Sequence, residues 1–318
     1  MNSDQRSAVS DQAPIASRQS PVANPQSPVS DLPDGDPVCV YAILPAAEIE
    51  LPSIPGIDQT RPVYGLAGKA VQAVVSRVRA DQFNQSALEA GLQDPAWIDV
   101  HVRAHQQVLD TLVATRQPVI PLRFCTIYRD EAAVRAVLTA HEPALVAELD
   151  RLRGRQEWGI KLFVAQEALQ AAILTQHTEP GDLTFALLSV EGDDAALRAL
   201  QTRIAGMSAG RAFLLQKKLD ALVVQKADEI TAGVVEESHA HLSGHAVAAT
   251  SLALHPNPPG MELNAAYLVA ERELDGFRAE LARLGEEYGG AGVRYELSGP
   301  WPAYNFIELD LNGRGNDQ

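Results

Sequence analysis

The last aromatic stretch of the chain reads Gly299-Pro-Trp-Pro-Ala-Tyr-Asn-Phe306 and places a Trp, a Tyr and a Phe within eight residues. We call this stretch the corner. Its two prolines fix φ and remove backbone donors, so it fits neither a helix interior nor a central strand. Strand-like alternation flanks it, over Val293–Leu297 before it and Phe306–Asp310 after it. The pattern predicts a rigid, extended turn that packs on a core and closes the second of two domains.

The second half of the chain, working back from the corner, reads as strands and helices in mixed order. A long helix is expected after the glycine-bearing loop Gly206–Gly210. An amphipathic helix with Leu274 and Leu284 on one face should stop at Gly289. The expected strands are Glu157–Val164, Thr184–Val190, Ala246–Leu254, Glu262–Val269 and Val293–Leu297.

The first half follows a similar order of elements. Val38–Leu44 is a nearly continuous apolar run, which is typical of a central strand. Asp94 and Pro95 form a helix start, with Asp as N-cap and Pro at the first helical position. A second helix begins at Asp130, and Pro143 should kink or interrupt it. Further strands are expected at Val63–Leu66, Val71–Val78 and Val119–Cys125.

Both halves come closest to a β-α-β-β-α-β layout, with helices covering one face of an antiparallel sheet. The sequence therefore predicts an α+β protein with two domains, residues 37–156 and 157–318. Residues 1–36 are rich in Ser, Gln, Pro and Asp and hold few large apolar residues. Such a segment cannot bury enough surface to offset its ordering entropy, so we expect a disordered tail.

Composition narrows the class of protein. The formal net charge is -15, which argues against binding to nucleic acid or to an anionic membrane surface. Two cysteines are too few for a disulfide framework and fit a reducing compartment. No apolar run approaches the ~18 residues of a membrane span, and the N-terminus lacks the features of a signal peptide. We expect a soluble, cytoplasmic protein.

No catalytic constellation emerges from the sequence. His239, His241 and His245 form the most metal-like cluster, but no four-ligand spacing accompanies them, and histidines near a helix C-terminus are the favoured interpretation. His105 falls on an apolar helix stripe and is expected in the core. The loop Gly206–Arg211 could present backbone donors to an anion, yet it matches no nucleotide-binding motif. We therefore expect no catalytic residues, no metal and no cofactor.

Several segments carry a family resemblance, in order and spacing. They are Tyr41-Ala-Ile-Leu44, His105-Gln-Gln-Val-Leu109, Pro121-Leu-Arg-Phe124 followed by Thr126, Glu157-Trp-Gly-Ile-Lys161, Gly210-Arg-Ala-Phe-Leu214 with Lys217-Lys218, Leu263-Asn-Ala-Ala-Tyr-Leu-Val269 and the corner. Together they resemble the gas vesicle protein F/L family (GvpF/GvpL) over about residues 38–310. Cys125 stands where the family usually has Gly, and Ala303 stands where a second Pro of the corner is common.

The resemblance implies two ferredoxin-like domains and an accessory protein of gas vesicle assembly, not an enzyme. Its implied partners are the hydrophobic shell protein (GvpA) and other gas vesicle accessory proteins. It would nucleate the shell or act as a chaperone of its subunits, in the cytoplasm and associated with gas vesicles. Two alternatives stay open: a minor structural component retained in the vesicle, and a small-molecule or metal-binding regulator or enzyme.

The resemblance and the residue types together select candidate interface or motif residues. Trp301 and Tyr304 are either contact residues for a partner or plugs that close a core. The basic positions among the candidates could bind acidic groups or simply pair with carboxylates of the same chain. The full set is Arg123, Phe124, Trp158, Lys161, Arg211, Lys217, Tyr267, Trp301, Tyr304 and Phe306.

Overall fold

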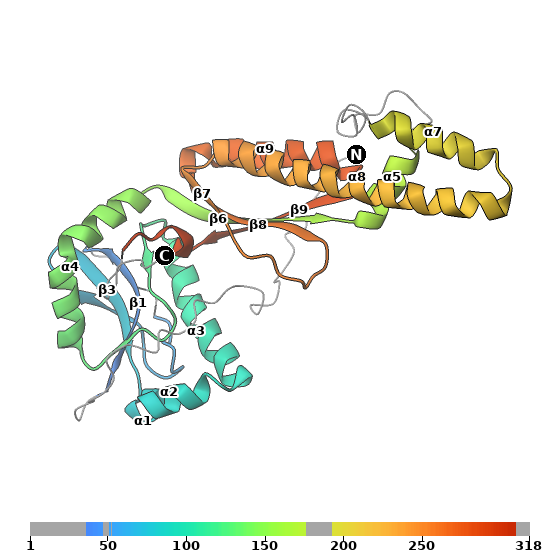
Figure 1. The fold of residues 1–318 in the computed structure, drawn as a ribbon. Helices are drawn as coiled ribbons and strands as arrows, with labels where there is room; N and C mark the ends of the chain where they lie inside the picture. Colours follow the sequence, from blue (N-terminus) through green and yellow to red (C-terminus); the bar gives the residue numbers. More distant parts are fainter. Residues whose placement is uncertain (1–35, 47–50, 52, 176–192, 310–318) are drawn as a thin grey trace, which may run out of the picture. The chain divides into compact units, whose positions relative to one another are not determined.

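The structure is a computed structural model that describes residues 36–46, 51, 53–175 and 193–309 (Figure 1). The tail predicted over residues 1–36 lies almost wholly outside the described residues, and so does the strand predicted at Thr184–Val190. The chain divides into two compact units, Met1–Arg155 with Trp301–Gln318, and Gln156–Pro300. Each unit contains helices and one antiparallel sheet, which confirms the predicted α+β class.

The sheet of the first unit is built around its first strand. The strands follow the order β2-β3-β1-β4, and β5 also pairs with β1. Ile43 of β1 lies opposite Ala73 of β3 and Ile120 of β4, so the predicted central strand is central. The strands are β1 (Val38–Pro45), β2 (Tyr64–Ala67), β3 (Val71–Arg77), β4 (Ile120–Pro121) and β5 (Ile127–Tyr128).

Two long helices of this unit begin where the sequence predicts. The Asp94 carboxylate accepts a hydrogen bond from the Ala96 N–H at 3.0 Å, and the Asp130 carboxylate accepts one from the Ala133 N–H at 2.7 Å. The second helix continues through Pro143 as one element. The helices are α1 (Ala80–Phe83), α2 (Gln85–Gly91), α3 (Pro95–Ala114) and α4 (Glu131–Leu152).

Helices cover both faces of this sheet, whereas the sequence predicts cover on one face. Every residue from Val38 to Leu44 is buried. Val108 and Leu109 of α3 pack with Tyr41 on one face, while α4 contacts β1, β2 and β3 without joining that cluster (Figure 1). Cover on two faces explains why β1 is a continuous apolar run and does not alternate.

The second unit has the β-α-β-β-α-β order, with three described helices in place of the first helix. Its strands follow the order β7-β8-β6-β9, the arrangement of a ferredoxin-like sheet. The strands are β6 (Arg155–Val164), β7 (Ala248–Ser251), β8 (Met261–Ala270) and β9 (Val293–Trp301). The helices are α5 (Gln166–Thr175), α7 (Asp193–Ala205), α8 (Ala209–Gly244) and α9 (Leu274–Gly289), with the short 3-10 turn η2 (Glu271–Glu273) before α9.

In this unit the core lies between one sheet face and the helices. Alternate residues of β6, such as Ile160 and Leu162, and alternate residues of β8, such as Ala265 and Tyr267, share one hydrophobic cluster with α8 and α9. Figure 1 shows α8 and α9 on the same face of the sheet. The period of two along β6 and β8 is the pattern expected for strands whose two faces differ.

The corner is divided between the two units: Trp301–Phe306 group with the first unit, and Gly299 and Pro300 with the second, whereas the sequence predicts that the whole corner closes the second domain. The Tyr304 hydroxyl donates to the Leu122 carbonyl at 2.9 Å, and Phe306 is buried. The strand predicted at Phe306–Asp310 is also wrong in its described part, because Phe306 ends the 3-10 turn η3 (Tyr304–Phe306) and residues 307–309 form no strand. Strand β9 lies at a sheet edge and ends at Trp301, so the following residues satisfy their polar groups on other elements.

Candidate protein-binding surface

Most aromatic candidates lie in the two cores. Phe124, Trp158, Tyr267 and Phe306 are buried. Trp301 and Tyr304 are half-buried, and Tyr304 packs against the hydrophobic cluster of the first unit. At these positions the aromatic side chains stabilise the fold by packing, and they expose little surface to a partner.

Tyr304 and His105 form the polar centre of the corner. The Nε2 atom of His105 lies 3.2 Å from both the Tyr304 hydroxyl and the Leu122 carbonyl oxygen, so a ring protonated at Nε2 donates to them. The His105 ring also meets Phe124 edge-on at 5.8 Å between centroids. Burial lowers the pKa of His105 to about 4, so this ring is neutral near pH 7. The expected core position of His105 is confirmed, and its ring bonds Leu122 and Tyr304 there.

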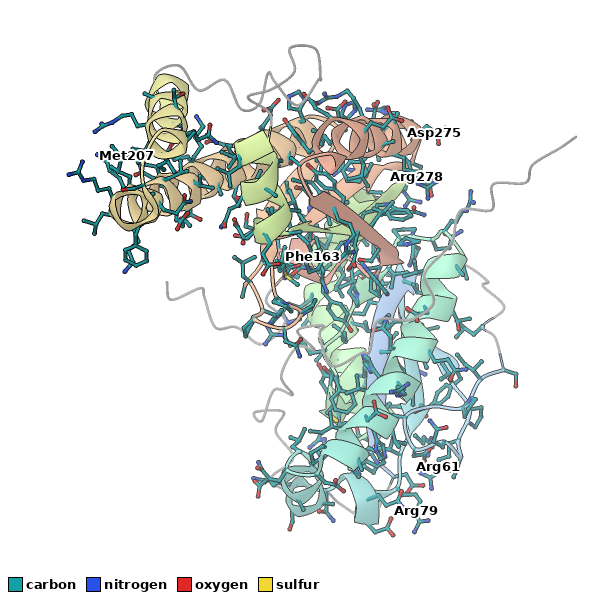
Figure 2. The ribbon with its side chains drawn as sticks, turned by 90° about the vertical axis from the view of Figure 1, so that its right-hand side faces the viewer. Arg61, Arg79, Phe163, Met207, Asp275 and Arg278 are labelled. Carbon is teal, nitrogen blue, oxygen red and sulfur yellow. The ribbon has the colours of Figure 1, made fainter. Side chains whose placement is uncertain are left out.

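Trp158 and Tyr267 have equally specific partners inside the second unit. The guanidinium carbon of Arg278 lies 4.9 Å from the Trp158 ring centroid, and Figure 2 labels this arginine. The Tyr267 hydroxyl lies 2.7 Å from Nδ1 of His239. Both aromatic rings join the core cluster, so their role is in packing α8 and α9 onto the sheet.

The histidines near the end of α8 have separate partners. His239 bonds Tyr267, whereas His241 lies 2.9 Å from a carboxylate oxygen of Glu280. Across residues 36–46, 51, 53–175 and 193–309, no three His, Cys, Asp or Glu side chains group in a way that could hold a metal ion. The donor arrangement of the described residues therefore gives the metal-binding alternative no support.

Helix α8 is longer than the sheet it covers. Its 36 residues span about 54 Å at the α-helical rise. The 10 residues of β8 span about 34 Å. The N-terminal part of α8 therefore runs past the strands, and α7 packs along it to form a helical hairpin (Figure 1). Met207 lies at the connection between the two helices, at the end of the hairpin (Figure 2).

This projecting part of α8 exposes large apolar side chains. Phe213 is 60% exposed, Leu214 is 73% exposed and Val224 is 45% exposed. Ala221 is exposed between them. We call Phe213, Leu214, Ala221 and Val224 the α8 stripe. Contiguous exposed apolar residues mark interaction sites more often than single ones do.

Basic residues lie close in sequence to the α8 stripe, on α8 and at the end of α7, and one carboxylate, that of Asp220, lies within its range. Arg203, Arg211, Lys217 and Lys218 are exposed, and the Lys217 ammonium lies 5.1 Å from the Phe213 ring centroid. Within the part of the chain that the structure describes, none of these four side chains pairs with a carboxylate. The surface is therefore both apolar and cationic, on a chain whose net charge is -15.

The sequence-based candidates contribute two residues to this surface, Arg211 and Lys217. The other two basic candidates lie elsewhere: Arg123 is exposed on the first unit, and Lys161 is half-buried on β6. Sequence reasoning missed the apolar members of the stripe. A usable signal was present, because Phe213-Leu214-Leu215 is a run of three apolar residues on a helix, and such a run cannot all face one core.

The described residues include no helix with the length and apolar composition that crossing a membrane requires. On the surface of the projecting hairpin, the arrangement can bind a partner through apolar contact and through its cations.

Comparison with known proteins identifies the family. Gas vesicle protein L of Streptomyces sp. (strain CB03234) is 34% identical over 243 residues, which cover 74% of this chain and 80% of that protein. Gas vesicle protein F of the same strain is 28% identical over 272 residues, covering 85% of this chain and 98% of that protein. The crystal structure of the gas vesicle protein GvpF from Anabaena matches the fold with a TM-score of 0.59 at 17% identity, covering 87% of this chain and all of that one.

The sequence profile of the family described as gas vesicle synthesis protein GvpL/GvpF matches residues 38–308. This range agrees with the resemblance that the seven sequence segments indicate, and it takes in both structural units and the corner. The chain belongs to the GvpL/GvpF family of gas vesicle proteins.

Proposed function

We propose that this protein is a cytoplasmic accessory protein of gas vesicle assembly that binds the hydrophobic shell protein GvpA and other accessory proteins. Family membership gives it a role in gas vesicle formation. The observation that carries the finer proposal is the α8 stripe, where Phe213 and Leu214 are 60% and 73% exposed. The protein acts by binding, as a chaperone of shell subunits, and not by catalysis.

The physical problem is the solubility of the shell subunit before assembly. A wall that keeps water out of a gas space needs an apolar surface, and a free subunit with such a surface aggregates. Covering it with Phe213 and Leu214 gains about 1.5–3 kcal/mol for each side chain that becomes fully buried. Contacts of this size support reversible binding, which suits a protein that must release its subunit to a growing shell. The charge of -15 keeps such a complex soluble.

Co-purification of the shell protein with tagged full-length chain tests this proposal. The variant Phe213→Ser, Leu214→Ser should retain at least tenfold less shell protein than the unmodified chain. Val100→Ser is the matched control, because Val100 is also an apolar residue that is 50% exposed on a helix, but it lies on α3 of the first unit. Equal retention of shell protein by the double variant and the control would overturn the role of the stripe.

The final location of the protein separates a chaperone from a wall component. A chaperone leaves its subunit when the subunit joins the wall, so washed vesicles should contain the chain only in trace amounts. Quantitative immunoblotting of isolated vesicles measures this. A constant ratio of this chain to shell protein after repeated washing would contradict the chaperone proposal.

A further inference from the structure

We infer that the outer face of α8, from Gly210 to Val224, docks an acidic amphipathic helix of a partner protein. The inference rests on the proposed function, because it specifies the chemistry of the partner that this surface would bind. It is drawn from three features of α8: the spacing of its exposed residues, the distribution of its charges and the position of Lys217.

The spacing of the exposed residues favours a helix as the bound element. Gly210, Phe213, Lys217, Ala221 and Val224 follow one another at intervals of three or four residues, and all are exposed. Residues with this spacing form a seam along one side of a helix, into which the side chains of a second helix fit. An amphipathic helix that lies in an apolar groove is a recurring mode of recognition and is read through the same spacing.

The beginning of the seam leaves room for close approach. A Cβ placed on Gly210 would meet nothing within 4 Å, so the space above its backbone is open. The next turn carries Phe213 and Leu214 on the same exposed side. Seam residues and core residues separate cleanly, because Leu219 and Val223 face the core cluster and are 5% and 3% exposed. Both sides of α8 are therefore apolar, and only one of them is covered by the described part of the chain.

Up to Leu219, the charges along the first part of the docking surface have one sign. From Ala195 to Leu219 the sequence holds five basic residues and no Asp or Glu. On α8 itself, Arg211, Lys217 and Lys218 are exposed beside the stripe, and the first carboxylate after them is Asp220. Opposite charges across an interface select the partner and fix its orientation, while apolar contacts supply most of the affinity. A helix with carboxylates beside its apolar stripe fits this surface.

The acidic residues that follow give the partner a direction. Asp220, Asp228 and Glu229 are exposed on the same helix, so α8 changes from basic to acidic along its length. A partner helix whose carboxylates are concentrated at one end would place that end over Arg211 and Lys217. The reverse direction would bring its carboxylates against those of α8, where like charges repel.

A second copy of the chain fits this surface poorly. Lys217 stands at the centre of the seam, three residues after Leu214 and four before Ala221. Two copies of α8 related by a two-fold axis through this centre would place the two Lys217 side chains opposite each other. The overall charge of -15 on each chain adds long-range repulsion between two whole copies.

The test uses full-length protein and two fluorescein-labelled helical peptides measured by fluorescence anisotropy. Both peptides carry Leu at spacings of three and four; one has Glu beside the Leu stripe and the other has Lys at the same positions. The Glu peptide should bind at least tenfold more tightly than the Lys peptide, and this preference should shrink as the salt concentration rises. Phe213→Ser, Leu214→Ser should weaken binding of the Glu peptide at least tenfold.

Charge-reversal variants test the role of the cations. Arg211→Glu, Lys217→Glu, Lys218→Glu should invert the preference, so that the Lys peptide binds more tightly. The matched control is Lys69→Glu, Arg123→Glu, Arg272→Glu, which changes the net charge equally at exposed positions away from the stripe. This control should keep the preference for the Glu peptide. Circular dichroism of both variants checks that they are folded.

Four outcomes overturn the inference. They are equal affinity for both peptides, an unchanged preference in the charge-reversed α8 variant, binding to phosphatidylserine vesicles that depends on the same three cations, and a dimer in sedimentation experiments that Phe213→Ser, Leu214→Ser dissociates. The shell protein takes no part in these measurements. If the unmodified chain retains no shell protein in co-purification but keeps its preference for the Glu peptide, the result counts against the proposed function alone. If it retains shell protein but shows no preference between the peptides, the result counts against this inference alone.

Discussion

The corner and the α8 stripe use aromatic side chains for opposite purposes. Tyr304 packs on the core of the first unit and bonds the Leu122 carbonyl and His105. Phe213 is 60% exposed, and its ring lies beneath the Lys217 ammonium. Both residues belong to segments that carry the family resemblance. The difference teaches that a motif residue identifies the family, whereas its burial decides whether it holds the fold or meets a partner.

Truncating one aromatic ring in each region tests most directly whether the corner and the α8 stripe differ in role. Phe306→Ala in the corner should lower the free energy of unfolding by about 3 kcal/mol or more, because it leaves a cavity in a buried site. Phe213→Ala in the α8 stripe should change it by less than about 0.5 kcal/mol. Urea titration followed by circular dichroism measures both. Similar losses of stability for the two variants would show that the regions do not differ in role.

The pH dependence of the free energy of unfolding tests whether the corner keeps His105 buried and neutral. Burial lowers the pKa of His105 from its ordinary value of 6.5 to about 4, so below pH 6.5 protons bind the unfolded chain more tightly than the folded one. The free energy of unfolding should therefore fall as the pH is lowered from about 6.5 to about 4, by an amount on the order of 3 kcal/mol from this residue.

His105→Gln isolates this contribution, because glutamine does not titrate. The variant should be less stable at pH 7 and should show a shallower fall between pH 6.5 and pH 4, as measured by urea midpoints at each pH. Peptide or shell-protein binding by the α8 stripe should not change at pH 7. An identical pH slope in the two proteins would contradict the assignment of a buried, neutral imidazole.

The smallest predicted effect concerns the loop that receives Tyr304. Cys125 has φ of 61°, in the left-handed region that favours glycine. A residue with a Cβ costs roughly 1–2 kcal/mol in this region, and glycine does not. Cys125→Gly should therefore be more stable than Cys125→Ala by about 1 kcal/mol in thermal or urea unfolding. The reverse order would show that the backbone is not held in this conformation.

Local sequence signals predicted most of the described strands and the long helices α3, α4, α8 and α9, but not α1, α2, α5 or α7. Asp94 with Pro95 and Asp130 each start a helix through a side chain that caps the backbone, an interaction confined to neighbouring residues. The apolar run Val38–Leu44 predicted a central strand, because its hydrophobicity fits burial on both faces. Gly289 ends α9 as predicted.

Long-range packing could not be predicted from the same signals. The Tyr304 hydroxyl and the Leu122 carbonyl are 182 residues apart in the chain, and no local pattern specifies that contact. The corner begins inside β9 of the second unit, which is why its sequence context placed it in the second domain. The exposed apolar residues of α8 could not be predicted for a related reason. Phe213 and Leu219 are both apolar helix residues, and only the tertiary structure shows which of them is covered.

Strand β9 has a consequence for how the sheet of the second unit can grow. It lies at one end of the strand order and carries Gly299 and Pro300 near its end, together with the ion-paired side chains of Arg294 and Glu296. Proline offers no N–H to an incoming strand, and charged side chains on an outer strand oppose further pairing. This edge is therefore poorly suited to act as a template for β-aggregation.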